Sequence, residues 1–114
     1  MSKQADFVSS LIDECFPFFN KKKEIYVNYQ KEKLFYDFLI DELRVLIEVQ
    51  GQQHYEFIEF FHKSYFNFQK QKKRDKLKEE WAEDNGYTLL KIEYSDELDK
   101  GIFLDKIREA LDAE

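Results

Sequence analysis

The 114-residue chain has little of what interrupts or cross-links a fold, with one cysteine, one proline and three glycines. The single cysteine, Cys15, excludes an internal disulfide and a zinc site made of several cysteines. No apolar run approaches the roughly 20 residues of a membrane span, and none near the start resembles a signal peptide. We therefore expect a cytoplasmic protein with short loops and no membrane partner.

The residues that are present are those of a globular domain. The chain is 43% hydrophobic and 37% charged, and its 18% aromatic content supplies large side chains for one core. A net charge of −6 argues against tight, nonspecific binding to nucleic acid. Residues 61–80 nevertheless hold seven basic side chains against three acidic ones. We expect a single domain over residues 1–114 in which one face is positive.

The hydrophobic periodicity predicts the elements of this domain. Apolar residues at helical spacing predict a helix over residues 3–16, which ends before Pro17. Strands are expected over residues 24–29, 34–40 and 43–50, with Asp41 and Glu42 as a two-residue turn between the last two. A polar helix over residues 64–85 carries Leu77 and Trp81, and Gly86 follows at its C-terminal cap.

A fourth strand is expected over residues 88–94, and Ser95 is expected to cap a last helix. The order is α-β-β-β-α-β-α. The hairpin is antiparallel and the crossover through the long helix favours a parallel pair, so the sequence predicts an α/β domain with a mixed sheet flanked by helices.

Four polar residues stand within or just after the apolar strands, namely Asp37, Glu48, Gln50 and His54. A two-residue turn would put Asp37 opposite Leu46, on the same face as Glu48 and Gln50. Two neighbouring carboxylates suit a hard divalent cation. Of the four residues, His54 is the one that exchanges protons near neutral pH.

These residues resemble the PD-(D/E)xK, or restriction-endonuclease-like, superfamily. The similarity is closest to domains like the very-short-patch-repair endonuclease and phage homing endonucleases, and it covers roughly residues 34–94. It rests on two features of the strands and two that follow them. Asp37 is an acidic residue in one strand, and Glu48 lies in a second strand that is followed by Gly-Gln-Gln-His at residues 51–54. An Arg-Asp-x-x-Lys motif lies in the helix at residues 74–78, and a strand over residues 88–94 comes after Gly86. Gln50 stands where the superfamily usually has lysine.

The resemblance implies a metal-dependent DNA endonuclease. Asp37 and Glu48 would hold Mg²⁺ or Mn²⁺, Gln50 would orient water or phosphate, and His54 would move a proton or contact the phosphate. Glu14 falls where the first helix of this family often supplies a further carboxylate. DNA phosphates would be gripped by the basic residues Lys70, Lys72, Lys73, Arg74 and Lys78. A homodimer, or a fused or separate recognition partner, would supply sequence specificity.

Other interpretations remain open from the sequence alone. Asp37 and Gln50 also suit polar strand ends, Glu48 suits a solvent-facing strand position, and His54 suits a structural role. Glu14 also suits an ordinary helix-edge position, and a lysine-rich run is also typical of a solvated helix face. The second function class is a non-catalytic nucleic-acid-binding or partner-binding module that retains the nuclease fold.

Overall fold

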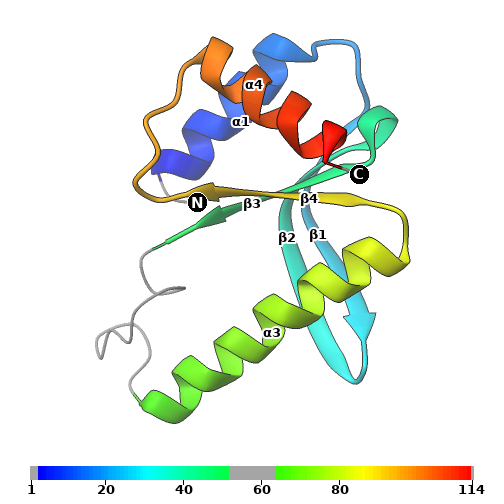
Figure 1. Cartoon of the computed structure of the whole chain (residues 1–114), viewed down its shortest axis with the longest axis vertical. Helices are drawn as coiled ribbons and strands as arrows, with labels where there is room; N and C mark the ends of the chain where they lie inside the picture. Colours follow the sequence, from blue (N-terminus) through cyan, green and yellow to red (C-terminus); the bar gives the residue numbers. More distant parts are fainter. Residues whose placement is uncertain (1–2, 52–63, 114) are drawn as a thin grey trace.

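The computed structural model describes residues 3–51 and 64–113. Within these residues the elements follow the predicted order (Figure 1). They are α1 (Lys3–Cys15), β1 (Lys21–Tyr29), β2 (Glu32–Ile40), the short 3₁₀ helix η1 (Asp41–Leu43), β3 (Val45–Gln50), α3 (Tyr65–Asp84), β4 (Thr88–Glu93) and α4 (Lys100–Asp112). The predicted α/β class and the predicted mixed sheet are confirmed.

The four strands form one sheet in the order β1-β2-β3-β4. The first three strands pair antiparallel, and β3 pairs parallel with β4. Helix α3 covers one face, while α1 and α4 cover the other (Figure 1). Two apolar clusters follow from this layering. One lies under α3 around Leu34, Tyr36 and Leu46, and the other lies under α1 and α4 around Phe38 and Ile47.

The turn between β2 and β3 is longer than predicted, because η1 and a left-handed Arg44 (φ 53°, ψ 42°) replace the two-residue turn. The Arg44 guanidinium donates hydrogen bonds to the carbonyls of Asn85 and Gly86, at 2.7 and 3.0 Å, and lies over the Tyr87 ring. These contacts hold Arg44 in a conformation that a residue with a Cβ otherwise disfavours.

The longer turn moves the register by two residues. Leu39, and not Asp37, pairs with Leu46. The prediction that Asp37 lies opposite Leu46 is therefore wrong. Extended by one residue, the observed register puts Asp37 opposite Glu48. A shift by two residues, unlike a shift by one, leaves each β3 side chain on the face of the sheet that was predicted for it.

Strand β2 also changes the face that it presents. Tyr36 belongs to the cluster under α3, whereas Phe38, two residues later, belongs to the cluster under α1 and α4. Regular alternation would place both on one face. In β1, Ile25 pairs with Tyr36, and the adjacent Glu24 has a φ of +55°. The two strands thus change face together, and Asp37 lies at the change.

The last helix begins later than predicted. Asp99 is its N-cap and accepts a hydrogen bond from the amide of Ile102 at 2.8 Å, so the prediction that Ser95 caps this helix is wrong. Ser95 lies in a turn, and the neighbouring Asp96 accepts a hydrogen bond from Glu93 N and pairs with Lys106. This turn delays the helix. No helix in the described ranges is long and apolar enough to cross a membrane.

Candidate active site on the α3 face of the sheet

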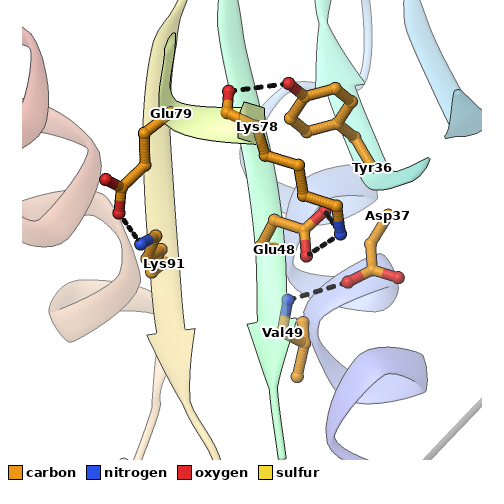
Figure 2. A network of polar contacts seen from close by, with 7 residues as sticks. All are labelled: Tyr36, Asp37, Glu48, Val49, Lys78, Glu79 and Lys91. Atoms are coloured by element: carbon orange, nitrogen blue, oxygen red, sulfur yellow. Dashed lines mark hydrogen bonds and ion pairs between the residues drawn. The ribbon is translucent and has the colours of Figure 1, made fainter. Parts of the chain in front are cut away.

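The centre of the candidate site is the carboxylate of Glu48, which is buried in β3. Glu48 is 4% exposed and lies two residues after Leu46, on the face covered by α3. The ammonium group of Lys78, from α3, lies 3.2 and 3.3 Å from the two carboxylate oxygens (Figure 2). The two side chains are 13% and 5% exposed, for Lys78 and Glu48 respectively. An unpaired charge at this depth would cost several kcal/mol, so Lys78 makes a buried Glu48 possible.

The packing of α3 determines where Lys78 lies. Ser64 caps the helix by accepting a hydrogen bond from Asn67 N, and Leu77 and Trp81 pack onto the sheet. The Tyr36 hydroxyl donates to the backbone carbonyl of Lys78 at 2.8 Å. Burial and, less strongly, the negative charge of Glu48 raise the pKa of Tyr36 well above its ordinary value. The Tyr36 hydroxyl therefore stays protonated at physiological pH and links β2 to α3 next to Lys78.

Asp37 lies beside Glu48 because the strands change face at this point. Its Oδ2 accepts a hydrogen bond from the backbone amide of Val49 at 2.8 Å, which fixes the carboxylate against β3 (Figure 2). Gln50 is 4% exposed and, by strand alternation, shares the α3 face with Glu48. The structure thus brings together three predicted site residues, Asp37, Glu48 and Gln50.

A second ion pair lies next to the first. Glu79 follows Lys78 on α3 and pairs with Lys91 of β4, and Lys91 is the register partner of Glu48 across the parallel ladder (Figure 2). Four charges of alternating sign therefore connect α3 to β3 and β4. The Glu79–Lys91 pair is the more exposed of the two, since its side chains are 54% and 29% exposed.

Other predicted site residues lie apart from this cluster. Glu14 is exposed on α1, in the helix layer on the opposite face of the sheet from α3. His54 lies outside the described residues, and its role stays a prediction. Four of the predicted DNA contacts are exposed along α3; these are Lys70, Lys72, Lys73 and Arg74. The fifth, Lys78, is turned to Glu48.

Sequence reasoning placed Lys78 among the DNA contacts and missed its pairing with Glu48. One signal was present. Lys78 directly follows Leu77 and precedes Trp81 by three residues, which puts it beside the apolar stripe of α3. A lysine at the edge of such a stripe can bury its methylene groups against the sheet and reach a buried carboxylate.

The carboxylate oxygens of Asp37 and Glu48 are of the type that binds a divalent cation. Mg²⁺ is commonly held by one or two carboxylates together with water and substrate phosphate oxygens, and Asp37 and Glu48 are two such carboxylates on neighbouring strands. Over residues 3–51 and 64–113, no group of three or more His, Cys, Asp or Glu side chains is placed to hold a metal. A cation bound here would therefore need water or phosphate ligands, and Lys78 would have to leave at least one Glu48 oxygen.

A groove of about 780 Å³ lies elsewhere, between the second half of α3, β4 and the end of α4. Its lining includes Glu79, Glu83, Lys91 and Ala113. Asp37, Glu48 and Gln50 do not line it, but Glu79 and Lys91 of the second ion pair do, so the groove lies on the β4 side of the candidate site.

Comparison with known proteins finds two viral relatives. Uncharacterized protein 307L of Invertebrate iridescent virus 6 is 41% identical over 54 residues, which are 47% of this chain and 27% of that protein. Uncharacterized protein 033L of Invertebrate iridescent virus 3 is 39% identical over 59 residues, which are 51% of this chain and 30% of that protein. The chain thus matches about three-tenths of the length of these relatives. No family model and no solved structure matches the chain.

Proposed function

We propose that this domain is a metal-dependent DNA endonuclease whose site is formed by Asp37, Glu48 and Lys78. The observation that carries the proposal is the contact between the Lys78 ammonium and the buried Glu48 carboxylate, at 3.2 Å. The chain departs from the pattern of the PD-(D/E)xK nucleases at Gln50, where those nucleases usually have a lysine. Lys78 brings a lysine ammonium to the Glu48 carboxylate from helix α3 instead of from strand β3.

Each residue has a distinct task in this proposal. Asp37, held by the Val49 amide, and Glu48 would bind the cation. The bound cation would polarise a phosphoryl oxygen and lower the pKa of a water molecule. Lys78, once released from one Glu48 oxygen, would stabilise the negative charge that develops on the phosphoryl group. Gln50 would orient water or phosphate with its amide.

The surface of α3 supports nucleic acid as the substrate. Lys70, Lys72, Lys73 and Arg74 are exposed on the same helix that delivers Lys78 to the site. Phosphate contacts from such side chains position a duplex without reading its sequence. A duplex held along α3 would lie next to the carboxylates.

The test is single-turnover cleavage of duplex DNA with Mg²⁺ or Mn²⁺. We expect EDTA, Asp37→Asn and Glu48→Gln to abolish cleavage while DNA binding persists. Lys78→Met should lower the rate by about 10²- to 10³-fold, as loss of a charge-stabilising donor does. Lys91→Met is the matched control, because it also removes a lysine from the α3 face and should cut within a few-fold of wild type. Wild-type cleavage by Asp37→Asn or in EDTA would refute the proposal.

The second candidate function is a non-catalytic binding module. The contact of both Glu48 oxygens with Lys78 favours it, because a buried ion pair also serves as a purely structural link between α3 and β3. In that case DNA or partner binding would be indifferent to EDTA and to Asp37→Asn, and no cleavage would be seen with either metal.

A further inference from the structure

The β1–β2 hairpin is a second basic segment, separate from α3. Residues 21–33 contain five lysines and two glutamates, which gives a net charge of +3 in a chain whose total is −6. Toward its turn the hairpin runs away from α1 and α4 (Figure 1). Its turn residues Gln30 and Lys31 both have positive φ, at 49° and 66°, which makes a tight two-residue reversal.

One face of this hairpin carries an aromatic pair, of which Tyr26 is exposed and Phe35 is half-buried. Tyr26 and Phe35 are register partners, and their ring centroids lie 5.0 Å apart. Tyr26 is 57% exposed, and the ammonium of Lys33 lies 4.7 Å from the centre of its ring. The neighbouring residues Ile25 and Leu34 pack under α3, so alternation turns Tyr26 and Phe35 to the other face.

Nothing in the described residues packs against this pair as a core. The cluster under α1 and α4 takes its β2 residues from Phe38 and Ile40, and residues 24–35 contribute none. A cross-strand aromatic pair stabilises its hairpin, and rings that are left partly in water remain available to a ligand as well. The accompanying positive charge selects a negatively charged ligand.

We propose that Tyr26, Phe35 and Lys33 form a stacking platform for unpaired nucleotides. Every nucleobase has a π-face that stacks on an aromatic ring, and a lysine beside the ring meets the phosphate, so this arrangement binds single strands with little sequence preference. An acidic protein surface would also be attracted by the lysines, but it does not present the regular succession of planar bases and phosphates that a single strand does. The inference rests on the proposed function only in its choice of nucleic acid as the ligand.

The platform and the candidate site share strand β2 but lie on opposite faces of the sheet. Phe35 precedes Asp37 by two residues on β2, which is about 7 Å at the rise of a strand. Because the strands change face at Asp37, the two rings point away from α3, whereas Glu48 lies under it. The platform is therefore a binding surface of its own, and a single strand held there is not placed at the carboxylates.

The test is binding of a fluorescein-labelled oligo(dT) of about 15 nucleotides by fluorescence anisotropy, in EDTA so that no cleavage occurs. We expect Tyr26→Ala to weaken binding by about 5- to 100-fold, and Tyr26→Phe to retain it, because stacking needs the ring and not the hydroxyl. Lys33→Gln should flatten the plot of log K against log[salt] by about one unit. Phe18→Ala is the control, since Phe18 is 94% exposed elsewhere on the surface, and it should bind like wild type.

The outcomes separate this inference from the proposed function. Binding that is lost in Tyr26→Ala and kept in Phe18→Ala supports the platform, even for a chain that cleaves nothing. Equal affinity of wild type and Tyr26→Ala overturns it, even if Mg²⁺-dependent cleavage is intact. If the wild-type protein does not bind oligo(dT) at low salt, the inference is also overturned. The same holds if the protein is a dimer that Tyr26→Ala dissociates while the affinity for oligo(dT) stays the same.

Discussion

At the scale of single residues, the buried polar groups of the α3 face depend on one another. The charge of Glu48 is compensated by Lys78, and the backbone of Lys78 is held by Tyr36, whose hydroxyl donates to its carbonyl. A carboxylate, an ammonium and a hydroxyl are thus each satisfied by a group from a different element. Removing one member leaves its partner buried without its hydrogen bond or counter-charge, which lowers the free energy of unfolding.

Tyr36 predicts a dependence of stability on alkaline pH. Its pKa in the folded protein is raised above the ordinary value of 10.0, mainly by burial. Folding is therefore favoured by protonated Tyr36, fully so below pH 10, and this contribution is lost as the pH rises toward the folded-state pKa. The wild-type protein should lose more stability than Tyr36→Phe between about pH 8 and about pH 11.

The measurement is urea unfolding of both proteins at the two pH values. Near pH 8, Tyr36→Phe should be less stable by about 1 kcal/mol, the usual effect of one lost hydrogen bond. Tyr26→Phe is the control, since Tyr26 is an exposed tyrosine of the same hairpin, and it should follow the wild-type curve. Parallel losses for wild type and Tyr36→Phe would contradict the assigned role.

At the scale of elements, the beginning of α4 shows how neighbouring residues compete to cap a helix. Ser95 and Asp99 both belong to residue types that cap helices, and both precede apolar residues. Only Asp99 caps α4, and its carboxylate accepts from Ile102 N. The hydrogen bond from Glu93 N to Asp96 closes the turn around Ser95 instead.

The two candidates can be separated by stability. Asp99→Ala should lower the free energy of unfolding by about 0.5–2 kcal/mol, because a helix amide loses its acceptor. Ser95→Ala should change it by less than about 0.5 kcal/mol, as is usual for a surface substitution. Chemical denaturation monitored by circular dichroism measures both. A larger effect for Ser95→Ala would mean that α4 begins earlier in solution.

At the scale of the whole molecule, the charge is divided between regions. The chain carries −6 in total, yet the exposed part of α3 and the β1–β2 hairpin are both basic. A nucleic acid would therefore be attracted to two surfaces and repelled by the remainder. Binding of this kind depends strongly on salt, because each neutralised phosphate releases counterions.

The α3 surface predicts a change in the salt dependence of duplex binding. Replacing Lys70 and Lys73 together by glutamine should reduce the slope of log K against log[salt] by about one to two units. The control is the double variant Lys3→Gln/Lys100→Gln, which removes the same charge from exposed positions on α1 and α4. Filter binding or anisotropy over a salt series measures the slope. An unchanged slope in the α3 variant, or an equal reduction in the control, would place the duplex elsewhere.

The sequence by itself determined the element order and the mixed sheet. Helical spacing before Pro17, the β-forming runs and Gly86, which adopts a φ of +76°, are local signals that do not depend on the rest of the chain. The same local reasoning put Glu48 and Gln50 on one face of β3, because alternation within a regular strand needs no knowledge of its partner.

Only the tertiary structure decided how these elements meet. Arg44 adopts its left-handed conformation because the end of α3, more than 40 residues later, offers two carbonyl acceptors, and this sets the register that puts Asp37 opposite Glu48. The change of face at Asp37 and the pairing of Lys78 with Glu48 depend in the same way on where α3 packs. Such contacts join residues that are far apart in the chain, and the local sequence pattern does not show which of them form. The candidate site was therefore only partly predictable from the residues that form it.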